Sequence, residues 1–172
     1  MATGDIKNIY IADSTLTVTN LHSLASNAAY TSGWESPTID HSTDGALDDA
    51  IGLHLVTHAS NRQVGAIRVY GVAMVNDSVW PDVFDGTESV ETWASAEVRD
   101  AAAILAKEVA TNATASAVFD IIIPSMRAVF SGTLPKKYAL YVTGNATTTT
   151  TAQLASSGST VTVRSSYLNV AA

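Results

Sequence analysis

The sequence lacks cysteine and carries little charge. None of its 172 residues is Cys, and Asp, Glu, Lys and Arg together make up 15% of the chain. The absence of thiols excludes a disulfide framework and thiolate metal sites, so stability must come from burial or from oligomerisation. The low charge leaves a neutral surface rich in Thr, Ser, Ala and Asn, which favours a protein that works packed against its neighbours.

Basic residues are scarce and scattered. Nine Lys and Arg residues stand against sixteen Asp and Glu, the net charge is −7, and Lys136-Lys137 is the only basic doublet. Binding to phosphate backbones or to anionic lipid needs a positive face that displaces counterions. We therefore expect no nucleic-acid partner and no membrane partner.

Targeting signals are missing too. The start, Met1-Ala2-Thr3-Gly4-Asp5, has neither the basic residues nor the apolar run of a signal peptide, and no apolar stretch approaches the length of a membrane span. We expect synthesis in a cytoplasm.

Local catalytic signatures are absent. The sequence has no Gly-x-Ser-x-Gly elbow, no phosphate loop and no dinucleotide fingerprint. His54 and His58 resemble half of a zinc motif, but on a strand four residues span about 13 Å, too far for one metal ion. The prediction is a protein that is not an enzyme, with no catalytic residues, no cofactor and no metal.

One acidic cluster leaves an alternative open. Asp40, Asp44, Asp48 and Asp49 lie close together in the sequence, and carboxylates on turns can hold calcium. Their spacing fits no known calcium loop, so solvated turn residues are the preferred interpretation. A metal-dependent enzyme built on Asp40 to Asp49 is the less favoured hypothesis.

Alternating hydrophobicity predicts the fold class. Strand patterns recur with turn residues between them, and no strand-helix-strand rhythm is present. The prediction is one antiparallel β-sandwich of jelly-roll type over residues 1–172, with little helix. Residues 1–30 form an N-terminal strand and connection that can serve as an arm. The clearest strands are Leu47 to His58 and Gly65 to Val75, and the short polar loop between them predicts a hairpin.

Four other segments are less regular. A short helical turn is expected near Leu21, an irregular connection from Ser125 to Leu134, and an extended edge from Thr147 to Thr151. From Thr92 to Val109 apolar residues recur at helical spacing, so the period alone predicts a helix.

The loop from Asn76 to Val90 contains an unusual number of apolar residues. It carries Val79, Trp80, Val83 and Phe84, and such a loop folds onto its own body or onto a partner. Trp34, at the start of an apolar strand, is expected in the core. Trp80 and Trp93 could instead stack on sugar rings, so a carbohydrate-binding module of a tail-associated adhesin is the alternative function.

The order of several motifs resembles the head decoration or cement proteins of tailed bacteriophages. The matching stretches are Gly33-Trp34-Glu35-Ser36-Pro37, Val69-Tyr70-Gly71, Gly132-Thr133-Leu134-Pro135-Lys136-Lys137-Tyr138 and Tyr167-Leu168-Asn169-Val170. The resemblance implies a β-sandwich, a non-enzymatic role in the virion, and a strand from Ala102 to Asn112. The longer segment from Asn76 to Asp100 departs from the pattern.

The resemblance and the composition together predict a partner. The resemblance implies a virion protein that binds the major capsid protein on the outer head surface. Few charges, no disulfides and apolar residues in a loop favour stabilisation by partners, so we expect a homotrimer that bridges neighbouring capsid subunits. The expected contacts are Trp80, Pro81 and Phe84 in the loop, and Lys7 at the end of an arm formed by Ala2 to Lys7.

Overall fold

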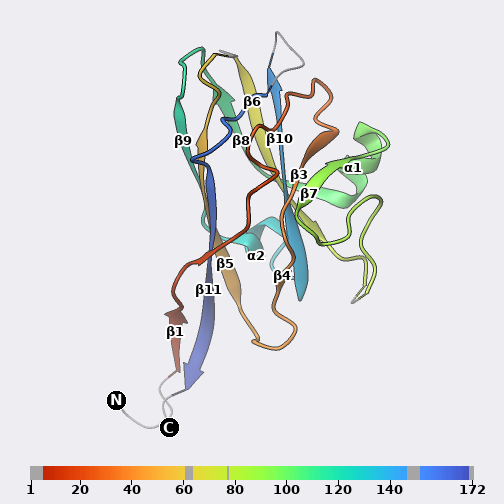
Figure 1. Cartoon of the computed structure of the whole chain (residues 1–172). Coiled ribbons are helices and arrows are strands. Elements are labelled where there is room, and N and C mark those ends of the chain that lie inside the picture. The colour runs from red at the N-terminus through yellow and green to blue at the C-terminus, as the bar shows by residue number, and fades with distance from the viewer. Residues whose placement is uncertain (1–5, 61–63, 77, 147–151, 171–172) are drawn as a thin grey trace.

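The computed structural model describes residues 6–60, 64–76, 78–146 and 152–170. Strands make up 49% of the structure and helices 7%. Two antiparallel sheets pack face to face along the length of the molecule (Figure 1). The predicted all-β sandwich is confirmed.

The strand order is that of a jelly roll. The first sheet runs β1 (Ile6–Tyr10), β11 (Thr160–Val170), β5 (Asp48–Val56) and β9 (Val118–Ile123), with β2 (Ser14–Thr15) also paired to β11. The second runs β7 (Ser89–Thr92), β3 (Ser32–Glu35), β10 (Lys137–Ala146), β6 (Gly65–Ala73) and β8 (Ala103–Thr111), with β4 (Ile39–Asp40) also paired to β10. If β2, β4 and β7 are left aside, the other eight strands can be renumbered 1 to 8 in chain order. The first sheet then has the order 1-8-3-6 and the second the order 2-7-4-5. That interleaving of early and late strands is the double Greek key of a jelly roll.

The main core fills the space between the two sheets. In β5, Ile51, Leu53 and Leu55 are buried, while the residues between them are more accessible. The inner face of the second sheet is equally apolar, with Leu140 and Val142 of β10 fully buried. Period-two alternation in the sequence therefore corresponds to one face per sheet turned inward.

A second core covers the outer face of the second sheet. Tyr70, Val72, Ala139 and Tyr141 point away from the main core and pack against Phe84, Trp93 and Ala103. The connection between β6 and β8 thus lies over this sheet, which explains why β10 is buried along nearly its whole length. The apolar loop was predicted to fold onto its own domain or onto a partner. Phe84 and Trp80 pack onto the domain itself.

The ambiguous segment from Thr92 to Val109 divides at residue 103. Helix α1 (Ala96–Ala102) is capped by Ser95, whose side chain accepts a hydrogen bond from the Val98 amide, and β8 follows directly. The strand implied by the resemblance is confirmed, and the helical period is wrong beyond Ala102. Between Val69 and Tyr70 of β6 the pairing with β8 shifts by one residue, so a bulge interrupts the alternation that would have identified a strand.

The predicted hairpin between β5 and β6 is wrong. The two strands lie in different sheets, β5 between β11 and β9, and β6 between β10 and β8. Alternation along each strand is the same for a hairpin and for a connection that crosses between sheets. The sequence pattern consequently could not distinguish them.

The remaining segments differ in smaller ways. Leu21 lies in a turn without a helix, and its side chain is fully buried in the main core. Helix α2 (Met126–Val129), capped by Ser125, falls in the stretch predicted to be irregular. The expected edge from Thr147 to Thr151 and the first part of the arm, Ala2 to Asp5, lie outside the described residues. Neither described helix could span a membrane.

Candidate functional site

The loop expected to contact a partner turns one of its three predicted residues inward. Phe84 is only 5% exposed, and its ring centroid lies 4.9 Å from that of Trp93. Trp80 and Pro81 are half-buried, and Trp80 packs so closely on Gly86 that a Cβ there would lie 2.8 Å from the indole Nε1. Phe84 is therefore a core residue, and the loop's accessible surface must come from others.

Three valines, rather than Phe84, are the exposed apolar residues of this loop and of β7. Val79 is 48% exposed, Val83 37% and Val90 50%. Together with Trp80 and Pro81 they leave apolar surface on the β6–β7 loop and on β7, the edge strand of the second sheet.

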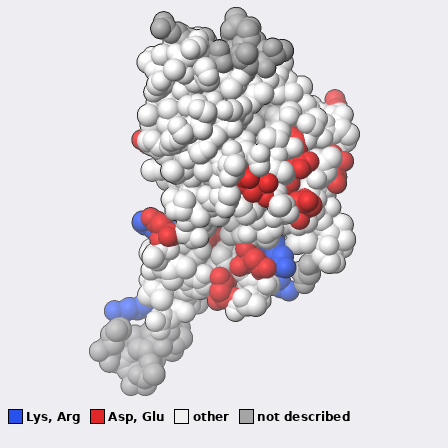
Figure 2. All heavy atoms as spheres, in the orientation of Figure 1, with Lys and Arg blue, Asp and Glu red and all other residues white. Residues whose placement is uncertain are grey.

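Acidic side chains accompany these apolar residues. Asp82, Asp85, Glu88 and Glu91 belong to the same segment, and no Lys or Arg occurs between Arg68 and Arg99. Figure 2 shows acidic side chains gathered on the side of the molecule where β7 and its preceding loop lie. We refer to the surface formed by Val79–Val83, Asp85, Glu88, Val90 and Glu91 at this edge of the second sheet as the acidic face. Val90 and Glu91 are consecutive on β7 and lie on its two sides.

A buried carboxylate lies beneath the acidic face. Glu35 of β3 is fully buried, and its Oε1 accepts a hydrogen bond of 2.6 Å from the Gly86 amide. Its Oε2 has no hydrogen-bond partner among the described residues. Burial, reinforced by the nearby charges of Asp85 and Glu91 and opposed by the Gly86 hydrogen bond, raises the pKa of Glu35 to about 7.

Glu88 fixes the acidic face to the sandwich. Its Oε1 accepts hydrogen bonds from the indole Nε1 of Trp34 at 2.7 Å and from the Asn20 amide at 2.6 Å. Trp34 itself is fully buried, as expected for a core residue. Since one carboxylate joins β3, the Asn20 turn and the start of β7, the acidic face is held against a rigid support.

Lys7, the other contact residue predicted from the sequence, lies far from Trp80 and Pro81. It is exposed on β1, opposite Asn169 of β11, at an edge of the first sheet. Figure 1 shows β1 and the end of β11 at one end of the molecule, away from α1 and β7. Tyr10 is 65% exposed on the same strand. The structure thus does not bring Lys7 together with Trp80 and Pro81.

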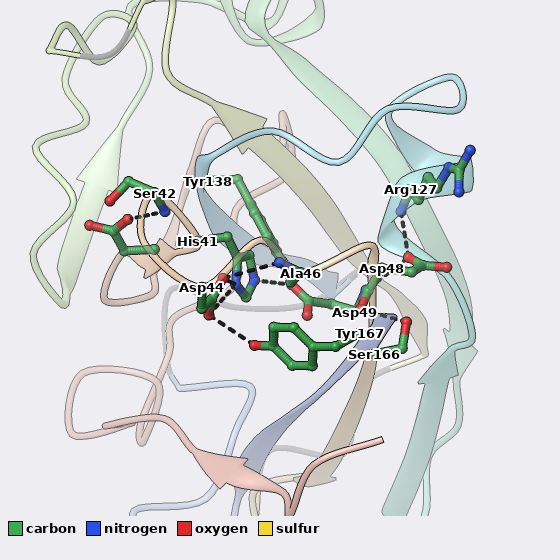
Figure 3. A network of polar contacts seen from close by, with 11 residues as sticks. His41, Ser42, Asp44, Ala46, Asp48, Asp49, Arg127, Tyr138, Ser166 and Tyr167 are labelled. Carbon is green, nitrogen blue, oxygen red and sulfur yellow. Dashed lines mark hydrogen bonds and ion pairs between the residues drawn. The ribbon is translucent and has the colours of Figure 1, made fainter. Parts of the chain in front are cut away.

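The acidic cluster from Asp40 to Asp49 closes around His41. The imidazole Nε2 lies 2.7 Å from Asp49 Oδ2, and Nδ1 lies 3.0 Å from Asp44 Oδ2 (Figure 3). Tyr138 donates its hydroxyl to Asp49, and Tyr167 donates to Asp44 at 2.8 Å. Because Asp49 and Tyr167 belong to the first sheet while Tyr138 belongs to the second, the network joins the two sheets.

The hydrogen bonds within this network keep His41 and its carboxylate partners charged despite their burial. Burial alone would lower the pKa of His41, but hydrogen bonds to Asp49 and Asp44 outweigh it and raise the pKa to about 9. Burial likewise opposes the ionisation of Asp49, yet His41, Ser165 and Tyr138 together lower the pKa of that carboxyl. His41 is therefore a cation between two carboxylates at neutral pH.

The side chains of this cluster, which the sequence offered as possible metal ligands, contact protein groups instead. Both nitrogens of His41 contact carboxylates, Asp40 pairs with Lys137 at 3.2 Å, and Asp48 accepts from the Arg127 amide at 2.8 Å. In the part of the chain that the structure describes, no three His, Asp or Glu side chains are grouped so as to hold a metal ion. The geometry is that of an electrostatic clamp between sheets.

The other candidate groups are dispersed. Trp93 is 2% exposed and cannot offer a stacking face to a sugar, so of the two proposed platforms only Trp80 is accessible. His54 of β5 points away from the core and pairs with Asp120 of β9 at 2.7 Å on an exposed sheet surface.

Two residues that matter here were not singled out from the sequence. The signal for His41 in the sequence is its position between Asp40 and Asp44, where an imidazole can pair with a carboxylate. Glu35 lies in a β-strand and carries no local sign that a loop fifty residues later would bury it.

No family model matches the chain, and no curated protein matches it.

Proposed function

We propose that the chain is a virion structural protein of a tailed bacteriophage that decorates the outer surface of the head. It binds the major capsid protein as a homotrimer and stabilises the shell by bridging neighbouring subunits. The proposal begins from the resemblance in Gly33–Pro37 and Gly132–Tyr138, and its setting is the virion, assembled in the host bacterial cytoplasm.

The observation that carries the proposal is that one group of charged side chains is engaged within the sandwich while another is exposed on its surface. The cluster of ionisable groups around His41 joins the two sheets and is engaged within the molecule. The acidic face remains accessible, and there apolar and acidic side chains lie on a rigidly supported loop and edge strand. A rigid sandwich with an exposed mixed surface suits attachment to another protein.

The experiment is examination of intact particles. Protein mass spectrometry and cryo-electron microscopy of purified virions should find the chain on the outer head surface at three-fold or quasi-three-fold positions. Particles made without it should release DNA at a lower temperature. If the chain is absent from heads, or lies only on tails, the decoration role is wrong. Native mass spectrometry of the purified protein tests the trimer separately.

A further inference from the structure

The carboxylates of the acidic face differ from most other acids of the molecule in having no cation. Asp13 pairs with Arg164, Glu108 with Arg68 and Asp100 with Arg99. Among the described residues, no such ion pair is made by Asp82, Asp85, Glu88 or Glu91. Negative charge without a partner therefore concentrates on one surface.

The buried carboxylate of Glu35 is a second and independent observation. Its Oε1 is bonded to the amide of Gly86, which follows Asp85 of the acidic face, while its Oε2 is buried without a hydrogen-bond partner in the described part of the chain. Burying a carboxylate oxygen without a donor is costly. A cationic group bound near Asp85 and Glu91 would offset that cost, because the charges of both residues act on Glu35.

The apolar residues of the acidic face indicate which kind of cationic group would bind there. Val79, Val83 and Val90 are exposed, and Trp80 is half-buried beside them in the sequence. A bare ion would leave these side chains in water, whereas Lys and Arg bring aliphatic stems as well as charge. Indole rings also attract cations over their faces.

We infer that the acidic face binds a segment of the partner protein that carries lysine or arginine together with apolar side chains. This inference rests on the proposed function, and the partner is the major capsid protein. A second copy of this chain is a poorer occupant, because it carries a net charge of −7 and four of its nine Lys and Arg residues, Arg68, Arg99, Lys137 and Arg164, are already paired with acids of their own molecule.

The test uses heads assembled from the major capsid protein without this chain. Wild-type protein should bind them with an affinity that falls as NaCl rises from about 50 mM to about 500 mM, because salt screens exposed charges. The triple variant Asp82→Asn, Asp85→Asn, Glu91→Gln should bind about tenfold more weakly at low salt. These substitutions keep the side-chain shapes and retain an oxygen that can accept from the Thr87 and Ala94 amides.

A matched control removes the same charge elsewhere. The triple variant Asp13→Asn, Glu108→Gln, Asp120→Asn also changes the net charge by three and lies on strands and connections away from the acidic face. It should bind within about twofold of wild type, since only its long-range charge differs. Melting curves of both variants establish that they are folded, and the salt dependence of the wild type needs no variant.

Distinct results separate the two proposals. Equal weakening by both triple variants, or wild-type binding that salt does not affect, overturns the inference while leaving decoration intact. Self-association of wild type that the first triple variant abolishes also overturns it, since the occupant would then be a second copy. Failure of wild-type protein to bind heads at all removes the proposed function, and the inference with it.

Discussion

The Nε2 atom of His41 lies 2.7 Å from Oδ2 of Asp49, and this pair joins the two sheets of the sandwich. His41 follows β4, which pairs with β10 of the second sheet, and Asp49 belongs to β5 of the first. Both side chains are buried, so the interaction is shielded from solvent.

Replacing His41 by Ala should destabilise the protein by about 3–5 kcal/mol, because the carboxylate of Asp49 would stay buried without its cation. Urea denaturation at pH 7 measures the free energy of unfolding. The control is His54→Ala, which breaks an exposed pair with Asp120 and should cost less than about 1 kcal/mol. Equal losses in the two variants would contradict the clamp.

The same pair predicts a loss of stability at alkaline pH. The pKa of His41 is raised to about 9 in the folded protein from an ordinary 6.5, so the folded state binds the proton more tightly. Its contribution is complete below pH 6.5 and is lost as the pH rises through about 9. The melting temperature should fall across this window in wild type, and His41→Gln should flatten the curve there. A wild-type curve without that fall would argue against a charged His41.

The buried carboxylate of Glu35 predicts a separate effect at lower pH. Its pKa is raised to about 7 from 4.5, so the folded state favours the protonated form and stability decreases as the pH rises from 4.5 to 7. Glu35→Gln should raise the melting temperature at pH 8 and change it little at pH 4. Glu108→Gln, on the exposed side of β8, is the comparison and should show no such contrast. A stabilisation by Glu35→Gln that is equal at both pH values would show that ionisation is not its cause.

Phe84→Ala should cost about 3–5 kcal/mol, because Phe84 fills the second core against Trp93 and Tyr141. Val83→Ala changes the adjacent, partly exposed residue and should cost less than about 1 kcal/mol. Chemical denaturation of the two variants distinguishes a residue of the core from one of the surface. A small effect of Phe84→Ala would mean that the loop does not hold its packed position.

Gly33→Ala should destabilise by about 1–3 kcal/mol through overpacking. A Cβ at this position would lie 2.5 Å from the backbone oxygen of Val142 and 2.7 Å from the ring of Tyr141. At Gly52 the only close atom is the Thr162 hydroxyl oxygen at 2.9 Å, at the end of a side chain that can rotate, so Gly52→Ala should cost less. Thermal unfolding compares the pair, and the opposite order would show that β3 can move away from β10.

The acidic face illustrates how far the candidate site could be predicted. The apolar content of the loop from Asn76 to Val90 indicated packing, and Trp80 and Pro81 do retain accessible surface. Nothing along the chain distinguished Phe84, which is buried, from Val83, which is not. Which apolar side chain faces inward depends on the turn that the loop makes over β3 and β10, and that turn is set by contacts distant in sequence, such as Glu35 with Gly86.

The sequence by itself determined that this protein is an antiparallel sandwich, because period-two alternation and frequent turn residues are local properties of the chain. The alternation along Leu47 to His58 also agrees with the burial of Ile51, Leu53 and Leu55 on one face of β5. Only the tertiary structure decided that β5 and β6 lie in different sheets, that a bulge interrupts the pairing of β6 with β8, and that His41 bridges Asp44 and Asp49. The physical reason is that most contacts of a jelly roll join residues far apart in sequence, so strand partners and charge partners depend on the closing of long loops.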